Sequence, residues 1–324
     1  MNRRDVVVTL GGTILIGIGF IAKAQGVKPA RRIGSLGLGV VGTTEELQRV
    51  WAPARDLGWV EGRTILIERR WTTDPEKLRS NAEELVRLDV ELIITNGDAA
   101  TVAAKSATTR IPIVMAGSFD PVRSGLVANL ARPGGNVTGY SSVAIALTEK
   151  SVEILREMLP DARRVGLLVY RPNPIAREQI ERACRSLGLE PIVLEVASAS
   201  AFEMALAEAS RQRVAALLIR IGGGTTNAED AALMRAVIKH PLPTVMNDRD
   251  LVRAGGLISL MADETEQYQI LAYYVDRILH GASPSDLPVQ QPTKFVLSIN
   301  LKTAKTLRLS IFRSLLARAD EVIE

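Results

Sequence analysis

The chain has 324 residues, more than one hydrophobic core usually organises, so two domains of about 150 residues each are expected. Hydrophobic residues make up 47% of it and charged residues 23%, the balance of a water-soluble globular protein. A net charge of only +4 and an aromatic content of only 4% argue against a nucleic-acid-binding surface, which needs clustered cations or stacking rings.

Residues 1–25 are predicted to be a secretory signal peptide. Arg3 and Arg4 precede an apolar stretch from Val6 to Ile21, and small residues on either side of a lysine lead to a cleavage site expected near Ala24. The stretch is shorter and richer in glycine than a membrane span requires. The paired arginines also resemble a twin-arginine signal, so export by Sec and export by Tat both stay open. We therefore expect a periplasmic protein.

After the signal, short β-branched runs alternate with amphipathic helical patterns, which is typical of parallel sheets covered by helices. The predicted strands are Arg32–Leu38, Thr64–Trp71, Leu92–Thr95, Pro112–Ala116, Arg164–Tyr170, Pro191–Val196, Ala216–Ile221, Pro243–Asn247, Leu257–Leu260 and Lys294–Ile299. The predicted helices include Pro75–Arg87, Glu149–Leu159, Ile175–Leu187, Ala201–Arg211, Ala228–Ile238 and Glu264–Leu279. This order predicts an α/β fold of two Rossmann-like lobes with parallel sheets, joined by a hinge.

The boundary between the lobes is expected near residue 140. The run Ala131–Asn136 is rich in turn residues, and a new long helix follows it, which marks a crossover. The helix predicted at Glu264–Leu279 is interpreted as a return to the first lobe, ended by His280 and by Gly281 as its C-cap.

We therefore predict a first lobe of residues 26–140 and about 263–288. The predicted second lobe comprises residues 141–262 and about 289–324. The lobe that holds the C-terminal segment stays open.

A glycine pattern, G-x-G-x-x-G, spans Gly37–Gly42 after the first strand, and Glu68 lies at the end of the second. Alone, this pattern indicates a dinucleotide-binding fold. In such a site the helix begins within the glycine run, whereas here Thr43–Glu46 forms a capping box that starts the helix after the last glycine. Pro53 is expected to kink or shorten that helix. No cofactor is expected, and an exported nicotinamide-dependent oxidoreductase is kept as the alternative function.

Sequence signatures of catalysis and metal binding are sparse. Neither His240 nor His280 stands in a recognisable pairing with a serine, so a Ser-His-Asp hydrolase is not predicted. The sequence has no C-x-x-C, H-E-x-x-H or calcium-loop spacing. Cys184 lies in an apolar helical pattern and is expected to be a small core residue. The chain is therefore predicted not to be an enzyme and to hold no metal.

Small polar residues follow several of the predicted strands. Because the carboxyl ends of parallel strands meet at one sheet edge, these loops are expected to face one cleft between the lobes, where helix N-termini and main-chain amides bind ligands. Gly222–Thr225 is interpreted as a loop that lets such amides approach. The candidate ligand-binding residues are Leu38, Asn96, Gly97, Asp98, Ala99, Ser118, Phe119, Asp120, Ser141, Tyr170, Asn173, Gly222, Asn247 and Asp248.

Several segments together carry a family resemblance. They are Leu57–Arg63, Ile111–Val114, Gly125–Gly139, Leu287–Phe295 and Ser314–Ile323. The chain resembles the ABC-transporter substrate-binding proteins of the tryptophan/tyrosine-receptor type, which are built on the type I periplasmic-binding fold, and the resemblance covers nearly all of the mature sequence. It implies a hinged receptor that closes on its solute, with no catalysis and no cofactor.

The resemblance also implies roles for the polar loops, with Asn96–Ala99 and Ser118–Asp120 as contacts from the first lobe. Tyr170, Asn173, Gly222 and Asn247-Asp248 are the implied contacts from the second lobe. The expected function is the periplasmic solute-binding component of an ABC importer, which binds a small amino-acid-like or organic-acid ligand in the cleft. The expected partners are that solute and a permease in the inner membrane, with no nucleic acid, and the protein is expected to be a monomer.

In this hypothesis each end of the ligand has its own contacts. The Ser118 hydroxyl and helix N-termini bind the anionic end. Asp248 balances an ammonium group, and Phe119 and Tyr170 flank the body of the ligand. Closure of the lobes then buries the ligand, and the importer recognises the closed form.

Overall fold

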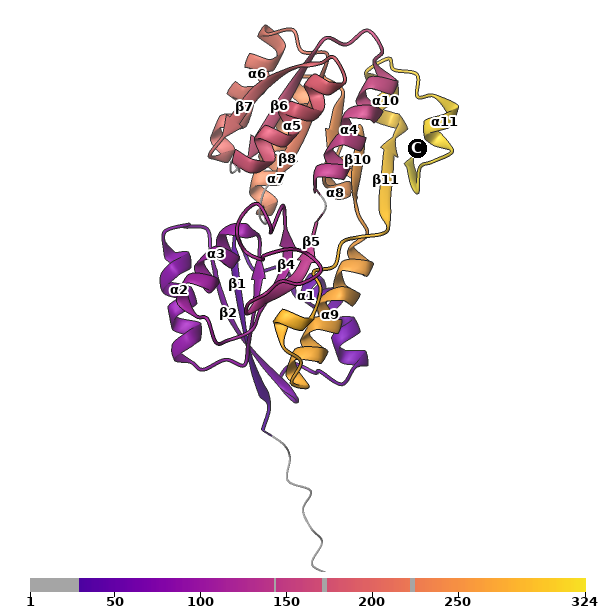
Figure 1. Ribbon diagram of the computed structural model, residues 1–324. Helices are drawn as coiled ribbons and strands as arrows, with labels where there is room; N and C mark the ends of the chain where they lie inside the picture. The colour runs from indigo at the N-terminus through magenta and orange to yellow at the C-terminus, as the bar shows by residue number, and fades with distance from the viewer. Residues whose placement is uncertain (1–28, 143, 171–173, 222–224) are drawn as a thin grey trace, which may run out of the picture.

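The computed structural model describes residues 29–142, 144–170, 174–221 and 225–324. Two β-sheets form the centres of two lobes that lie end to end (Figure 1). The predicted signal peptide and the candidate residues Asn173 and Gly222 fall outside the described residues. Within those ranges, no helix combines the length and the apolar character that a membrane crossing requires.

The sheet of the first lobe has the strand order β2-β1-β3-β4-β5, and every neighbouring pair in it is parallel. Its strands are β1 (Arg31–Leu38), β2 (Ile65–Thr72), β3 (Leu92–Asn96), β4 (Ile113–Ser118) and β5 (Val137–Ser141). The helices on it are α1 (Thr44–Asp56), α2 (Lys77–Arg87), α3 (Asp98–Ala107) and α9 (Glu264–Leu279). Apolar side chains of α2 and α3 pack on one face of the sheet, and those of α1 and α9 pack on the other.

The sheet of the second lobe has the order β12-β11-β10-β9-β8-β6-β7, with β10 and β11 antiparallel and the other pairs parallel. Its strands are β6 (Arg164–Tyr170), β7 (Glu190–Val196), β8 (Ala216–Ile221), β9 (Thr244–Met246), β10 (Ile258–Ala262), β11 (Phe295–Asn300) and β12 (Glu321–Ile323).

Helices cover both faces of this second sheet as well. They are α4 (Ala144–Met158), α5 (Pro174–Ser186), α6 (Phe202–Arg211), α7 (Asn227–Lys239), α8 (Arg249–Arg253), α10 (Leu301–Thr306) and α11 (Arg313–Leu316). Apolar residues of α4 and α5 share one core cluster, and those of α6, α7 and α8 share another. Two short 3-10 turns, at Ala199–Ala201 and Pro284–Asp286, complete the elements of the described residues.

The chain passes between the lobes after β5, after β10 and before β11 (Figure 1). These passages are hydrogen-bonded to one another through the main chain. The amide of Ser141 donates to the carbonyl of Gln290 at 2.9 Å, and the amide of Asp263 donates to the carbonyl of Lys294 at 3.0 Å. The connection between the lobes is therefore a bundle of adjacent segments and not a single flexible linker.

The predicted α/β architecture is confirmed, and each predicted strand is present within a few residues of its expected bounds. The C-terminal strands β11 and β12 pair in the second sheet, which answers the question left open by the sequence. The prediction placed no strand at Val137–Ser141, whereas these residues form the buried strand β5. The turn residues directly before this short strand concealed it.

The first glycine of the pattern at the end of β1 is explained by packing. A Cβ on Gly37 would lie 2.6 Å from the ring of Trp71, and the capping box between Thr43 and Glu46 starts α1 as predicted. The expectation that Pro53 would shorten this helix is wrong, because α1 continues to Asp56. The proline ring removes only one ladder hydrogen bond, and that bond lies in the last turn of a surface helix.

Candidate functional site

A pocket of about 360 Å³ lies between the two sheets, at the carboxyl ends of their strands. This volume lies within the range of small-molecule sites. The first lobe and the start of α9 contribute Asn96, Gly97, Asp98, Gly117, Ser118, Phe119, Tyr140, Ser142 and Gln267. The second lobe contributes Leu147, Thr148, Val169, Tyr170, Ile180, Arg220, Ile221, Asn247, Leu260, Met261 and Ala262. Both lobes therefore line one cavity, as the strand-end argument predicted.

Asp98 ties two loops of the first lobe together. It is the first residue of α3, and Gly97 before it has a φ of +83°, which favours glycine. The Asp98 carboxylate accepts the hydroxyl of Ser118 at 2.5 Å and the amide of Phe119 at 3.2 Å. The Ser118 proton is thus engaged by Asp98, so this hydroxyl offers the pocket an acceptor and not the free donor expected for an anionic ligand.

The floor of the pocket on this side is held by side chains that bond to the main chain. The Ser142 hydroxyl donates to the carbonyl of Ser118 at 3.0 Å, and Gln267 at the start of α9 donates to the carbonyl of Ala116. Because Gln267 lies in α9, which follows β10 of the second lobe, this contact also fixes α9 against β4. The loop after β4 is therefore held in place from two directions.

Tyr140 lies in β5 where the chain leaves the first lobe, and only 1% of it is exposed. Its hydroxyl is buried and has no hydrogen-bond partner among the described residues. Burial raises the pKa of this hydroxyl, and the negative charges of Glu266 and Asp263 raise it further. The hydroxyl therefore stays protonated and keeps a donor for a group that enters the pocket.

On the opposite wall, Arg220 occupies the next-to-last position of β8. The Arg220 guanidinium donates to the neighbouring carbonyl of Ile219 at 3.1 Å. Burial lowers the pKa of Arg220 to about 10. That value is still far above neutrality, so Arg220 carries a positive charge at pH 7.

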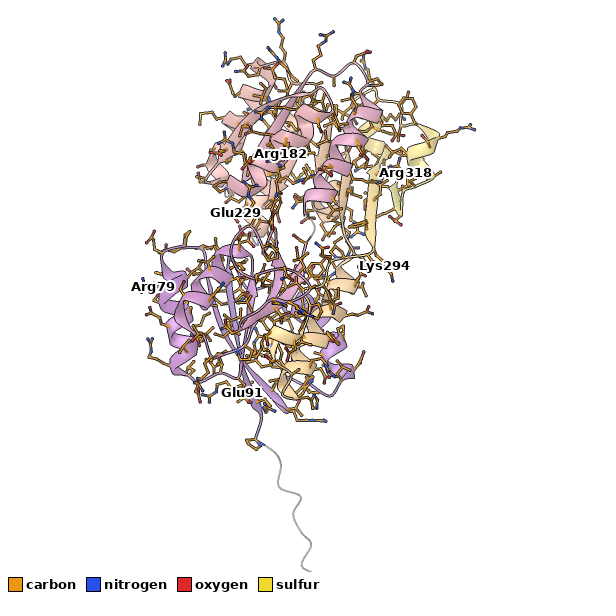
Figure 2. All side chains as sticks on the ribbon, in the orientation of Figure 1. Arg79, Glu91, Arg182, Glu229, Lys294 and Arg318 are labelled. Atoms are coloured by element: carbon orange, nitrogen blue, oxygen red, sulfur yellow. The ribbon has the colours of Figure 1, made fainter. Side chains whose placement is uncertain are left out.

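Asn247 and Tyr170 complete the polar wall of the second lobe. The Asn247 amide spans the main chain of Ile221, accepting its N–H at 3.1 Å and donating to its carbonyl at 3.2 Å. The hydroxyl of Tyr170 bonds to the carboxylate of Glu229, which lies at the edge of the second lobe facing the first (Figure 2). The Tyr170 ring lies 4.9 Å from that of Phe202, so this wall is fixed from behind.

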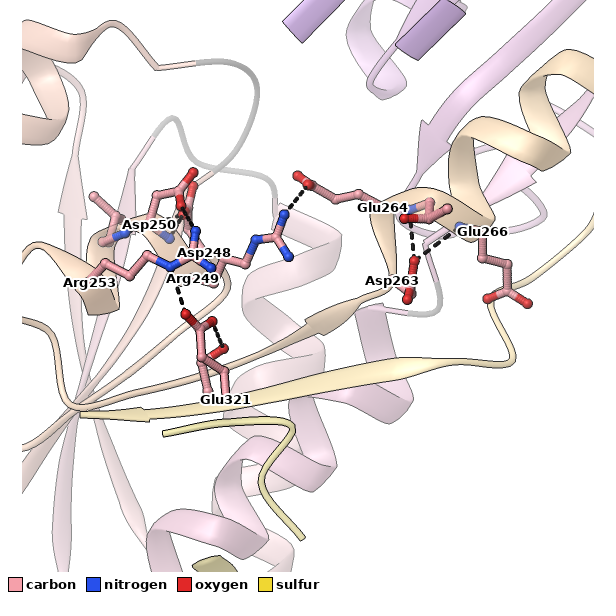
Figure 3. A network of polar contacts seen from close by, with 11 residues as sticks. Asp248, Arg249, Asp250, Arg253, Asp263, Glu264, Glu266 and Glu321 are labelled. Carbon is pink, nitrogen blue, oxygen red and sulfur yellow. Dashed lines mark hydrogen bonds and ion pairs between the residues drawn. The ribbon is translucent and has the colours of Figure 1, made fainter. Parts of the chain in front are cut away.

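Charged side chains also join the lobes outside the pocket. Arg123, after β4, forms an ion pair with Glu178 of α5, and Gln179 beside it donates to Asp120 at 3.4 Å. On the hinge side, Arg249 of α8 pairs with Glu264 at the start of α9 at 3.1 Å (Figure 3). The structure is therefore in a conformation with contacts across the cleft.

The structure brings half of the candidate residues to the pocket. Those that line it are Asn96, Gly97, Asp98, Ser118, Phe119, Tyr170 and Asn247. Those placed elsewhere are Leu38, Ala99, Asp120, Ser141 and Asp248. The Asp248 carboxylate caps α8 by accepting the amides of Asp250 and Leu251, and Asp120 faces α5 outside the pocket. Neither carboxylate is positioned to balance a charge on a ligand in this pocket.

Sequence reasoning missed five polar residues of the pocket, namely Tyr140, Ser142, Thr148, Arg220 and Gln267. Arg220 had a detectable signal, because an arginine is exceptional in a run of apolar strand residues such as Ala216–Ile221. Tyr140 was hidden by the unrecognised strand β5. Gln267 had no local signal, because only the return of α9 to the first lobe brings it to the site.

Comparison with known proteins agrees with this architecture. Residues 53–323 match a family described as ABC transporter substrate binding protein. The tyrosine-binding protein of Clostridioides difficile (strain R20291) is 24% identical over 260 residues, covering 78% of this chain and 73% of that protein.

Solved structures extend the comparison. A domain of Streptococcus pneumoniae in complex with L-Trp has a TM-score of 0.80 and 24% identity, and the match covers 91% of this chain and all of that one. A conserved domain protein of Vibrio cholerae has a TM-score of 0.80 and 25% identity over the same shares. Because the family match spans most of the sequence, this chain belongs to the ABC transporter substrate binding protein family.

Proposed function

We propose that this substrate-binding protein captures its solute in the pocket between the lobes and presents the closed, loaded form to an ABC permease in the inner membrane. The observation that carries the proposal is the pocket itself, which is lined by strand ends of both sheets. A ligand that touches both walls stabilises the closed conformation relative to the open one. The size of this effect is the difference between its binding free energies to the closed and the open conformation. A permease that reads the closed form can thereby distinguish loaded from empty receptor.

The moving units in this proposal are a first lobe of residues 26–140 and about 263–288, and a second lobe of residues 141–262 and about 289–324. The hydrogen bonds between the passages at Ser141, Asp263 and their partners support a hinge at this place. The Arg123–Glu178 pair lies on the cleft side, so it forms only when the lobes close. Hinge bending about adjacent segments is the usual motion of such receptors.

The proposed solute is a small amino-acid-like molecule or organic acid with an apolar body. Apolar side chains form much of the second wall, including Val169, Ile180 and Leu260, and Phe119 lines the pocket from the first lobe. Relatives described as a tyrosine-binding protein and as a complex with L-Trp fit this class of ligand. Asn96, Asp98 and Asn247 supply the polar contacts that orient it.

The cellular setting follows from the family and the N-terminus. Proteins of this family act outside the cytoplasm. We propose that the signal peptide of residues 1–25 is cleaved near Ala24 after export by Sec or Tat, and that the mature chain works as a monomer with no cofactor and no catalytic step. The family match favours this function over the oxidoreductase alternative, and packing against Trp71 accounts for Gly37 without a cofactor.

Filling the pocket tests the proposal. A Cβ on Gly117 would have one neighbouring atom within 4 Å, on Gln267 at 3.9 Å, so Gly117→Leu places a side chain in the pocket without a main-chain clash. Gly135→Leu is the matched control, since a Cβ there meets nothing within 4 Å and Gly135 does not line the pocket. Calorimetric titration with amino acids and organic acids should show binding to wild type and Gly135→Leu and none to Gly117→Leu. Equal binding by all three proteins would refute the site.

A further inference from the structure

Among the described residues, Arg220 is a cation without a countercharge in the wall of the pocket. It pairs across the sheet with Val169 of β6, which lines the same pocket. In the part of the chain that the structure describes, no carboxylate forms an ion pair with it, and its guanidinium donates only to the carbonyl of Ile219. Other arginines near the cleft are paired, including Arg123 with Glu178 and Arg249 with Glu264.

The surroundings of Arg220 are apolar. Ile180 of α5 also lines the pocket, and the nearby thiol of Cys184 is buried and protonated, because desolvation raises its pKa to about 11. A guanidinium held among apolar groups loses hydration that no protein charge replaces. An arrangement that is unfavourable in the empty protein becomes favourable when an anion enters, because charge-assisted hydrogen bonds are strongest at a partly desolvated site.

The shape of the site limits which anion fits. The guanidinium presents N–H donors in a planar fork, which matches the two oxygens of a carboxylate. The described residues of the pocket include one arginine and no lysine, too little positive charge for a phosphate ester. The adjoining apolar side chains leave room for a hydrocarbon or aromatic body next to the carboxylate. The buried hydroxyl of Tyr140 offers a donor to a second polar group.

We propose that Arg220 recognises a carboxylate of the transported solute, so that the receptor selects monocarboxylates with an apolar body and rejects their uncharged counterparts. This inference rests on the proposed function. In this inference a single side chain of the second lobe binds the anionic end of the solute, in place of the Ser118 hydroxyl and the helix N-termini.

Matched acids and amides test the charge requirement. Wild-type protein is titrated calorimetrically with L-tryptophan, L-tyrosine and L-leucine, with the carboxamide of each, and with D-glucose and D-galactose as neutral solutes. The expected result is that at least one acid binds and that its carboxamide binds about 30-fold more weakly or worse, since a desolvated partner of Arg220 is lost. The identity of any solute released from natively purified protein is determined by mass spectrometry and added to the panel.

Variants of Arg220 then assign the effect to this side chain. Arg220→Met should weaken binding of the acid by about 30-fold or more while leaving the carboxamide unchanged, and Arg220→Lys should restore part of the affinity because it keeps the charge. Arg235→Gln is the control, an exposed arginine on α7 of the same lobe. The empty Arg220→Met protein should melt at or above the wild-type temperature, because it loses an unpaired, partly buried charge. That result excludes misfolding as the cause of weaker binding.

The outcomes separate the inference from the function on which it rests. If a carboxamide or a sugar binds as tightly as the best acid, or if Arg220→Met binds the acid like wild type while Gly117→Leu does not bind it, the inference is overturned and the pocket stands. A neutral solute released from the native protein would also overturn the inference and leave the pocket as the binding site. If no compound of the panel and no released solute shows binding that Gly117→Leu abolishes, the proposed function fails and the inference fails with it.

Discussion

The guanidinium of Arg123 in the first lobe forms an ion pair across the cleft with the carboxylate of Glu178 in the second lobe. Glu178 also pairs with Arg182 of its own helix at 2.8 Å. One carboxylate thus has one partner that depends on closure and one that does not. This gives an internal control for the contribution of the cleft contact to binding.

We predict that Arg123→Gln weakens solute binding by about two- to fivefold, the range for an exposed ion pair. Arg182→Gln removes the pair within α5 and should leave affinity unchanged, because that pair is the same in the open and closed forms. Calorimetry measures the affinity, and X-ray scattering of the empty protein measures the degree of closure. Equal affinities for the two variants would show that the Arg123–Glu178 pair does not stabilise the closed form.

The same pair predicts a pH dependence. The hydrogen bond and the charge of Arg123, aided by the charge of Arg182, lower the pKa of Glu178 from its ordinary value of 4.5. The contribution of this pair to closure is therefore fully present above pH 4.5 and is lost as the pH falls through the lowered pKa. The ratio of wild-type to Arg123→Gln affinity should stay constant between about pH 5 and 8 and approach one at lower pH. A ratio that changes near neutrality would contradict this assignment.

Asp98 is predicted to support the pocket by orienting Ser118 and Phe119. Asp98→Ala removes the hydrogen-bond acceptor of Ser118, a residue that is only 1% exposed, so the free energy of unfolding should fall by about 1–3 kcal/mol. Solute affinity should fall as well, by about tenfold, because both loops line the pocket. Urea denaturation and calorimetry measure the two effects. Asp161→Ala, at an exposed position before β6, is the control and should change neither quantity.

Two buried tyrosines of the first lobe, Tyr274 in α9 and Tyr140 in β5, should respond differently to removal of their hydroxyls. The Tyr274 hydroxyl donates to the carbonyl of Pro288 and accepts the amide of Gln290 at 3.1 Å, so Tyr274→Phe should cost about 1–3 kcal/mol of stability. The Tyr140 hydroxyl has no partner among the described residues, so Tyr140→Phe should leave the empty protein as stable or more stable. Thermal unfolding without solute measures both. A loss of stability in Tyr140→Phe as large as in Tyr274→Phe would show that the Tyr140 hydroxyl is already bonded.

Gly139 in β5 is predicted to accept no side chain. Its φ is +130°, and a Cβ would lie 2.4 Å from the carbonyl oxygen of Met115 in the adjoining strand. Gly139→Ala should therefore lower the free energy of unfolding by about 2–5 kcal/mol, from strain and overpacking together. Gly135→Ala, which meets nothing within 4 Å, should stay within about 0.5 kcal/mol of wild type. Denaturant titration of both variants checks this difference.

The fold could be predicted well from the sequence, because the strands and the helices each have a local residue pattern. Apolar strand runs such as Arg164–Tyr170 and capping boxes such as Thr43–Glu46 are short-range signals, and both appear in the structure. The site was predicted only where residues stand at the carboxyl end of a predicted strand or in the loop directly after it, as at Asn96, Ser118 and Tyr170. The same reasoning failed at Asp248, because the sequence does not show whether a carboxylate caps its own helix or faces a cavity.

The remaining pocket residues depend on tertiary arrangement. Arg220 and Tyr140 lie within strands, and the direction of their side chains follows from strand register and sheet order. Gln267 reaches the first lobe only because α9 returns to it from the second. Residues of this kind become candidates once the sheets are placed, and together they supply the positive charge and the buried hydroxyl of the pocket.

A crystal structure of the protein with the solute released from its native preparation tests the central claim most directly. The account predicts one solute molecule enclosed between the lobes, in contact with Asn96 and Ser118 on one side and with Arg220 on the other. It also predicts that the Arg123–Glu178 pair is intact in that complex. A solute bound outside this pocket, or a complex in which only one lobe touches it, would contradict the account.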